Sequence, residues 1–535
     1  MDAGAVSNIN YNNYNGSAGS KCPNADIGKN MPEQSAGAST ADTFVSSVET
    51  SGEAASSPAF IMTSADKYKE GADVREMAYG LGQNAIRGDF VASDYTVLKA
   101  NDGDNEIKLS QDVSGRLFVD VDGSRKSFSA SEARKLIIDG GGGNDRIIAD
   151  DSVKINLHIV GGQGGDHIET GSGNDFIIDN YGANFIAAGG GDDRIIANQF
   201  DGQAEPRSIE VKGGAEGPSG ANGTASVSVT GNYIDGGDGA DYIVGGKGGD
   251  YIIAGSGNDV VYGLSGDDYI DGGDGRDYID GGKGNDIIFA GAGSDMVFGG
   301  RGSDTINADS GNNVIVGGRD RDTINGGSGV NRIDTDGKDI ISGGDNTVET
   351  VKPKRVSGRI SVKTNDEGYR ERVESDLEAL ASSSTGQKMI KGLAHMRLHG
   401  VKISPTDSGN SCTYNMSGVA HDNGFPSIGC SSTVSYNRAV INVGGAAWGE
   451  RPPVVGLYHE LAHAYDAGKG IMDGHMYYYD GRRAPDNSQS YAAVQGAELQ
   501  AVGIDIGNDK LRLNPEGISE NSLRDYLGLE NRPTY

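Results

Sequence analysis

The sequence predicts a multidomain protein with a disordered N-terminal leader, a parallel β-roll and a C-terminal domain of mixed α and β structure. Its 535 residues are enough for about two to four domains. With 87 glycines and a net charge of −30 against 36% hydrophobic residues, one large segment cannot be an ordinary globular core. A nine-residue repeat fills the middle of the chain, and apolar residues at helical spacing follow only after it.

Two segments precede the repeats. Residues 1–90 are rich in Ser, Asn, Ala and Gly, so we expect a largely disordered leader. This composition resembles the unfolded export signals of type III secretion, and a flexible tail without function is the alternative. Residues 91–139 alternate short apolar runs with Asp-Gly turns, which is typical of short strands. We interpret them as a β-rich cap that shields the first repeat.

Eleven consecutive nonads run from Gly236 to Asp334, after looser copies that begin at residue 140. The eighth residue of every nonad is Ile or Val. The sixth residue is Asn at Asn313 and Asn331, and in the other nine nonads it is Asp: Asp241, Asp250, Asp259, Asp268, Asp277, Asp286, Asp295, Asp304 and Asp322. We expect each nonad to form a turn and a short strand, with the eighth residues stacked between two parallel sheets. Residues 140–341 are therefore predicted to be a β-roll, with an irregular insertion at 201–231.

The sixth position carries the chemistry of the repeat. Asp residues from successive turns supply the hard oxygen ligands that Ca²⁺ prefers, and Gly permits the backbone conformation that turns carbonyl groups inward. Without a cation the stacked carboxylates would repel one another, so we predict calcium-dependent folding. The repeat resembles the RTX family, which implies several structural Ca²⁺ ions. A flexible Gly- and Asp-rich linker is the alternative, and eleven unbroken periods argue against it.

The last segment, residues 351–535, has the pattern of an α+β domain. Residues 335–357 lose the repeat and gain Lys and Pro, which indicates a boundary. Two helices are predicted within 373–398, separated by Ser-Ser-Ser-Thr-Gly, and short strands are predicted around 439–443. The three cysteines are too few for a disulfide framework, so we favour free thiols over a Cys412–Cys430 bridge.

One helix of this domain carries the candidate chemistry. The segment from 457 to 464 lacks helix breakers and places His459 and His463 four residues apart on one face. Two imidazoles at this spacing can bind one Zn²⁺, and Glu460 is placed to take a proton from a metal-bound water. We predict a catalytic zinc here. A helix with two ordinary, partly buried histidines is the alternative.

A catalytic zinc keeps three protein ligands and one open position, so a third donor is required. Four residues could supply it: Asp466, Asp473, His475 and Glu498. Asp466 follows on the same helix and is better placed to bond a ligand imidazole. Glu498 lies in a second predicted helix, residues 490–503, and a Glu ligand on a second helix is the gluzincin arrangement. His475, in a predicted loop, is the reserve.

The terminal domain resembles the NleD-like family of type III effector zinc metallopeptidases. The resemblance covers about 351–535 and rests on HELAHAYD at 459–466, on the segment 498–503, and on the segment 518–524 that leads to the C-terminal Arg-Pro-Thr-Tyr. It implies a zincin-like metallopeptidase fold. It also implies that His459, His463 and Glu498 are the zinc ligands and that Glu460 is the general base.

The overall plan is similar to that of clostridial neurotoxin light chains, in which an Arg-x-x-Tyr pair stabilises the oxyanion. Arg532 and Tyr535 match that spacing. A cation and a phenol aimed at the developing oxyanion are what peptide hydrolysis needs beyond the metal. Arg524 is the alternative donor, and a frayed chain end is the alternative interpretation of the pair.

Composition limits the partners of the protein. Residues 140–341 carry about 33 acidic against 13 basic residues, and no basic stripe suited to nucleic acid is present. No apolar run is long enough to span a membrane, and the segment 1–60 holds no secretory apolar region. The chain is therefore expected to be soluble and exported without a classical signal peptide.

We predict a secreted bacterial zinc endopeptidase with calcium-binding repeats, delivered into a host cell by a type III system to cleave a protein there. Known relatives cut host signalling kinases, which is what the resemblance implies for the substrate. One alternative is a calcium-binding adhesive surface protein with a non-catalytic terminal domain. Another is a peptidase released into the medium or against competing bacteria.

Overall fold

The computed structural model describes a defined part of the chain, to which the account below is confined. The described residues are 60–64, 95–197, 207–212, 224–356, 358–364, 367–396, 400–406, 410–414, 431–436, 452–469, 476–478, 493–495, 501–502, 518–527, 529 and 531.

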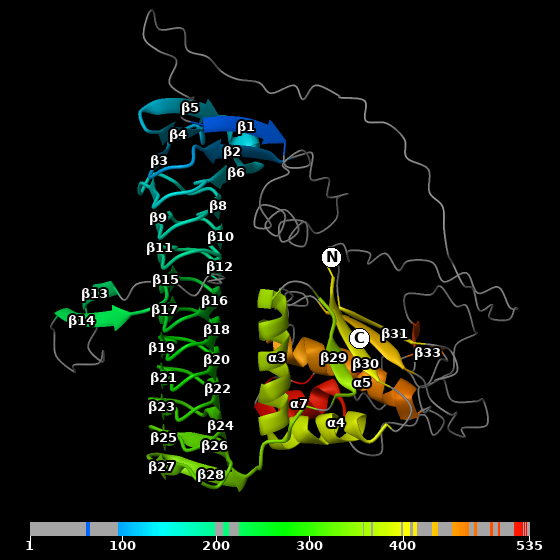
Figure 1. Cartoon of the computed structure of the whole chain (residues 1–535). Helices are drawn as coiled ribbons and strands as arrows, with labels where there is room; N and C mark the ends of the chain where they lie inside the picture. The colour runs from blue at the N-terminus through cyan, green and yellow to red at the C-terminus, as the bar shows by residue number, and fades with distance from the viewer. Residues whose placement is uncertain are drawn as a thin grey trace, which may run out of the picture. The chain divides into compact units, whose positions relative to one another are not determined.

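Two sheets of 13 strands each face one another and form the predicted β-roll (Figure 1). Each nonad supplies one strand, and successive strands alternate between the sheets. Equivalent positions in neighbouring strands of one sheet are therefore two nonads apart in the sequence, as in the parallel register that aligns Ile243 with Val261 and Val261 with Ile279. The period of nine in the sequence is thus half a coil of the roll.

The first sheet contains, in spatial order, β1 (Phe60–Ser64), β2 (Thr96–Ala100), β6 (Leu136–Asp139), β8 (His158–Val160), β10 (Phe176–Ile178), β12 (Arg194–Ile196), β16 (Tyr242–Lys247), β18 (Val260–Ser265), β20 (Tyr278–Lys283), β22 (Met296–Arg301), β24 (Val314–Arg319), β26 (Val330–Thr335) and β28 (Asp345–Thr350). The second contains β27 (Ile340–Ser342), β25 (Thr323–Asn325), β23 (Thr305–Asn307), β21 (Ile287–Phe289), β19 (Tyr269–Asp271), β17 (Tyr251–Ser256), β15 (Tyr233–Asp238), β11 (Phe185–Ala187), β9 (His167–Glu169), β7 (Arg146–Ala149), β3 (Glu106–Gln111), β4 (Leu117–Val121) and β5 (Ser124–Phe128).

The eighth residues of the nonads form the core between the sheets, as predicted. Nearly all of them are fully excluded from solvent, and they belong to one apolar cluster that continues into the cap. Stacking branched aliphatic side chains in this way removes their surface from water, which is the main favourable term for so narrow a fold.

The N-terminal end of the roll is closed by antiparallel strands. β1 pairs with β2, and β3, β4 and β5 form a meander. The short helix α2 (Ala130–Ala133) begins with a reciprocal capping box between Ser129 and Glu132. β1 lies inside the segment expected to be a disordered leader, so that expectation is wrong for residues 60–64.

Two further departures concern the edges of the repeat. The insertion at 201–231 contains an antiparallel hairpin of β13 (Arg207–Lys212) and β14 (Thr224–Val229). The roll also continues through β27 and β28, to residue 350 rather than 341, where the sequence has already lost its period. The step from β26 to β28 is shorter than two full nonads, because Val330 aligns with Asp345.

Within its described residues, the C-terminal domain contains four helices and two small sheets. The helices are α3 (Glu367–Ser382), α4 (Ser384–Ala394), α5 (Pro453–Lys469) and α7 (Glu520–Leu527). The four-stranded sheet has the order β29 (Ile360–Val362), β30 (Val401–Pro405), β32 (Ser432–Tyr436) and β31 (Ser411–Tyr414). β33 (Met476–Tyr478) pairs with β34 (Ala493–Gln495).

The two predicted helices within 373–398 are confirmed as α3 and α4. They are separated at Ser383, whose side chain accepts a hydrogen bond from the Gly386 amide and so caps α4. The strands expected at 439–443 lie outside the described residues, as do Cys22 and Cys430. Among the described helices, none combines the length and the apolar character needed to cross a bilayer.

The predicted helix at 490–503 is wrong in its first half. Residues 493–495 form strand β34, antiparallel to β33, and within this segment helix is described only at residues 501–502. Pairing with a distant Met-Tyr-Tyr strand outweighs the modest helix preference of Ala-Val-Gln.

Candidate calcium ladders and metal centre

The sixth-position side chains form two ladders, one along each edge of the roll. In one ladder the backbone amide of Asp250 donates to Oδ1 of Asp268 at 2.9 Å, and the amide of Asp268 donates to Oδ1 of Asp286 at 2.9 Å. The other ladder repeats this bond from Asp241 to Asp259 and from Asp259 to Asp277. Every link joins one coil to the next, so each carboxylate is fixed by the coil that precedes it.

The second oxygen of each carboxylate, Oδ2, takes no part in these ladder hydrogen bonds. Oδ2 of all nine predicted aspartates is buried and has no hydrogen-bond partner among the described residues. A Cβ placed on Gly236 would lie 2.5 Å from both Asp241 Oδ2 and the Ala254 carbonyl oxygen. Carboxylate and carbonyl oxygens therefore converge where only a glycine leaves room, which is a donor set that fits Ca²⁺.

Electrostatics make these carboxylates unstable without a cation. Burial raises the pKa of Asp241 from its usual value near 3.8 to about 7. Burial, together with the neighbouring carboxylates of Asp259 and Asp295, raises the pKa of Asp277 to about 9. A bound divalent cation reverses this balance, because it stabilises the charged form of each group.

Asparagine takes a different role at the same position. Oδ1 of Asn313 accepts the bond from the Asp295 amide, but its Nδ2 donates to the Ala308 carbonyl oxygen at 3.0 Å. Nδ2 of Asn331 likewise donates to the carbonyl oxygen of Gly326 at 2.6 Å. In these coils the asparagine side-chain amide donates to the backbone carbonyl oxygen that could otherwise bind a cation.

The candidate metal centre of the terminal domain lies on α5. Proline at its first position has the φ angle that a helix requires, and an apolar flank buries the helix. His459 and His463 are buried on one face, with ring centroids 4.8 Å apart and ring planes at 88°. Glu460 and Asp466 are also buried. The predicted helix and its pair of histidines are therefore in place.

Glu520, a residue that the sequence analysis did not single out, faces this pair. Its Oε2 lies 3.0 Å from Nδ1 of His459, and its Oε1 accepts a hydrogen bond from Nε of Arg524 at 2.7 Å. Both Glu520 and Arg524 are buried on α7. The two atoms lie within ion-pair distance, and a carboxylate beside Nδ1 can orient an imidazole so that Nε2 is available to a metal, which fits a zinc ligand.

Arg524, which the sequence analysis offered as the alternative oxyanion donor, donates a hydrogen bond to the Glu520 carboxylate in the structure. Glu498, Arg532 and Tyr535 lie outside the described residues, as do the other candidate ligands Asp473 and His475. Within the described part of the chain, no group of three or more His, Cys, Asp or Glu side chains is placed to hold a metal.

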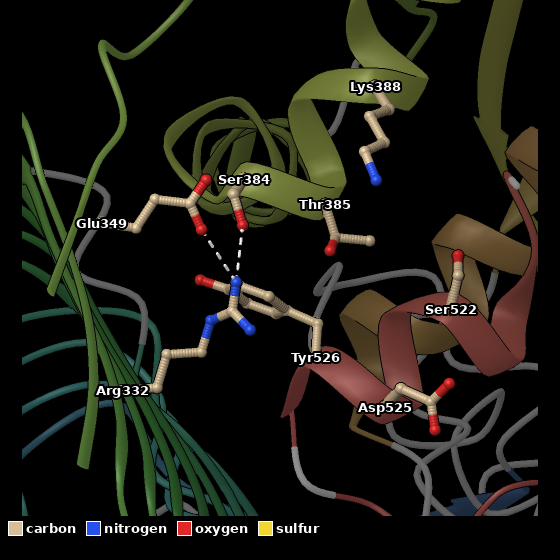
Figure 2. Close-up of a pocket in the computed structure, with 8 residues that line it drawn as sticks. All are labelled: Arg332, Glu349, Ser384, Thr385, Lys388, Ser522, Asp525 and Tyr526. Carbon is tan, nitrogen blue, oxygen red and sulfur yellow. Dashed lines mark hydrogen bonds and ion pairs between the residues drawn. The ribbon is translucent and has the colours of Figure 1, made fainter. Parts of the chain in front are cut away.

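A cavity of about 340 Å³ lies elsewhere in the molecule, where the last strands of the roll meet α4 and α7 (Figure 2). Its lining includes Arg332 and Glu349 from the roll and Ser384 and Tyr526 from the terminal domain. None of the residues of the candidate metal centre lines it. The cavity therefore belongs to the junction of the two parts rather than to the candidate chemistry.

These features define a calcium-type β-roll joined to an α+β domain whose helix carries a HExxH pair. Residues 357–535 match the family model Peptidase M91, described as effector protein, which is the NleD-like metallopeptidase family. Six segments between 137 and 333 match the RTX calcium-binding nonapeptide repeat: 137–152, 160–198, 235–270, 262–297, 271–306 and 298–333. No curated protein matches the chain.

The two matches confirm that the chain fuses an effector peptidase domain to RTX repeats, which bind calcium. They fit a secreted effector peptidase whose substrate is a protein.

Proposed function

We propose that the protein is a secreted zinc endopeptidase that hydrolyses a protein of a host cell. The observation that supports it most directly is the pair His459 and His463 on one buried helix face, with Glu520 against Nδ1 of His459. A metal-binding imidazole usually has its second nitrogen held by a carboxylate, a backbone carbonyl or a water molecule, and Glu520 is in that position here.

The chemistry follows from the side chains. Zinc, when bound by His459 and His463, lowers the pKa of a water molecule and polarises the scissile carbonyl. Glu460 accepts the proton of the attacking water and returns it to the leaving amine. Glu520 keeps His459 in the tautomer that has Nε2 available, and Arg524 holds the Glu520 carboxylate in place.

Three further residues belong to the proposal. Glu498 is the proposed third zinc ligand, as the family resemblance implies. Arg532 and Tyr535 are proposed to donate to the oxyanion that forms at the substrate carbonyl, where fixed donors contribute most to the rate. All three lie within the segment that matches the peptidase family.

Delivery by a type III system and a host signalling protein as substrate complete the proposal. The effector description of the family and the polar leader support them. A truncation of residues 1–59 keeps β1 intact and tests the leader: an injected effector loses delivery, while its peptidase activity on a purified substrate stays the same.

The catalytic assignment is tested with the full-length chain in calcium. Zinc content and hydrolysis of a peptide library are measured for the wild type, H463A, E498Q and E460Q. We expect H463A and E498Q to lose zinc, and E460Q to keep zinc while losing hydrolysis by two orders of magnitude or more, on the order of a general base. Full zinc retention by E498Q would remove Glu498 from the ligand set. Unchanged behaviour of E460Q would favour the adhesive, non-catalytic alternative.

A further inference from the structure

The outer face of the first sheet is covered by the terminal domain. Aromatic and aliphatic side chains of β16, β18, β20, β22 and β24 are buried in the same apolar cluster as residues of α3, α4, α5 and α7. On the roll these residues are Tyr242, Val244, Val260, Tyr262, Leu264, Tyr278, Met296, Phe298, Val314 and Val316. The described residues of both parts belong to one compact unit. The core of the described terminal domain therefore continues into the outer face of the roll.

A buried polar network fixes the register of this contact. Arg372 of α3 is fully buried, and its guanidinium carbon lies 3.2 Å from the centroid of the Tyr262 ring of the roll. Asp376, one helical turn later, accepts hydrogen bonds from the hydroxyls of Tyr262 at 3.1 Å and Tyr436 at 3.0 Å. Without the roll, Asp376 would keep the Tyr436 hydroxyl but lose that of Tyr262, and the Arg372 guanidinium would lose the Tyr262 ring that it packs on.

A second set of contacts joins the last coils of the roll to α4. Oδ2 of Asp334, on β26, accepts a hydrogen bond from the Ser384 amide at the start of α4 at 2.8 Å. Arg332 donates to the Ser384 hydroxyl at 3.0 Å and to Glu349 at 3.1 Å (Figure 2). Glu378 at the end of α3 pairs with Arg301 and Arg319 of the roll.

Helix α7 reaches from the roll to the candidate metal centre. At one end, the Tyr526 hydroxyl donates to Oδ2 of Asp334 at 2.7 Å, and Arg332 stacks 4.4 Å over the Tyr526 ring. At the other end, Glu520 meets His459. The helix has only eight residues and so spans about 12 Å, which makes it a short, stiff link.

The proposed calcium ligands lie next to the strands of the roll that the terminal domain covers. Asp259 and Asp277 of the calcium ladder directly precede β18 and β20, whose Tyr262 and Tyr278 are buried under the terminal domain. Oδ2 of each of these carboxylates is buried without a hydrogen-bond partner, so a bound cation should stabilise the two strands in the positions that the terminal domain covers.

We propose that the roll is an integral part of the peptidase, and that calcium controls the zinc site through α7, with Tyr526 and Asp334 as positioning residues. Only the part of this inference that concerns zinc rests on the proposed function. It implies that the enzyme is active where calcium is abundant and loses its zinc site where the roll holds no calcium.

The test uses the full-length protein, freed of calcium by dialysis and then titrated with calcium. Hydrogen exchange at the amides of α5 and α7 and the zinc dissociation constant, from competition with a chromophoric chelator, are measured at each step. Calcium should slow exchange in both helices and tighten zinc binding by roughly tenfold or more, as expected when a partner of a ligand histidine becomes ordered.

Y526F removes one hydroxyl and should lose most of the calcium effect on zinc affinity while binding as much calcium as the wild type. Y269F is the matched control, because Tyr269 stacks in the second sheet on Tyr251, away from the terminal domain. It should respond as the wild type does. Identical zinc affinity and α7 exchange with and without calcium, or wild-type coupling in Y526F, would overturn the proposal. A protein that binds no zinc would remove the proposed function, and the exchange data would still decide the coupling.

Discussion

Replacing Asp268 by Asn should change the stability of the roll in opposite directions with and without calcium. The side chain keeps its shape, and its Oδ1 still accepts the Asp250 amide. The substitution exchanges the orphaned Oδ2 for an amide, the arrangement already present at Asn313. It therefore removes a proposed calcium ligand and, at the same time, a buried ionisable carboxyl group.

The size of the effect follows from the neighbouring carboxylate. Burial first, and the charge of Asp268 second, raise the pKa of Asp286 from 3.8 to about 8. At pH 7, holding one such group in the metal-free fold costs up to about 4 kcal/mol relative to the unfolded chain, where it is ionised. D268N relieves only the part of this cost that comes from Asp268, so it should stabilise the calcium-free protein by about 1 to 3 kcal/mol. It should destabilise the calcium-saturated protein because a proposed ligand is lost.

The assay is urea unfolding followed by circular dichroism, in calcium-free and calcium-saturated buffer. D267N is the matched control, since Asp267 is exposed and its Oδ1 accepts hydrogen bonds from the backbone amide of Asn285 at 2.7 Å and from its side-chain Nδ2 at 3.2 Å. An exposed isosteric change should alter stability by about 0.5 kcal/mol or less in either buffer. Equal signs of the D268N effect in both buffers would refute the assignment of Oδ2 as a calcium ligand.

Three further predictions follow from the structure. The calcium concentration at the folding midpoint should rise as the pH falls from about 8 to 6. The ladder carboxylates have raised pKa values, so protons compete with calcium for them. Calorimetry at several pH values measures this midpoint, and a midpoint that does not change with pH would contradict the prediction. G255A should destabilise the roll by about 3 kcal/mol in thermal unfolding, because its Cβ would lie 1.9 Å from the Gly237 carbonyl oxygen. G123A meets no neighbouring atom and carries only the strain of a φ of +83°, so it should cost about 1 kcal/mol. E520Q should weaken zinc binding by roughly tenfold in a chelator competition without changing calcium stoichiometry, and an unchanged dissociation constant would argue against contact with His459.

The regular part of the roll could be predicted from the sequence, because each coil repeats one local pattern and the contacts between coils repeat with it. The eighth and sixth positions are the core and the carboxylate ladders that their residue types predict. The prediction weakens where the period shifts: β28 aligns Asp345 with Val330, so its place in the sheet is set by the coil beneath it rather than by the nonad pattern.

Long-range pairing limits what the sequence shows elsewhere. β1 lies in a polar segment and forms by pairing with β2, so local composition does not indicate it. Glu520 comes long after His459 in the chain; it lies in the segment 518–524 that supports the family resemblance, but no spacing rule links it to His459. The HExxH helix was predictable because ligand and base share one helical turn, while the carboxylate behind His459 depends on how α7 packs on α5.

The hydrogen bonds of the aspartate ladders give the roll a direction. Each amide of a ladder residue donates to the side chain one coil later, never to the coil before it, as between Asp286 and Asp304 or between Asp304 and Asp322. A coil thus satisfies its own ladder amide only once its C-terminal neighbour is in place. Removing coils from the N-terminal side leaves every remaining ladder amide bonded, whereas removing them from the C-terminal side leaves one amide open on each edge. The stack is therefore polar, with two chemically unlike ends.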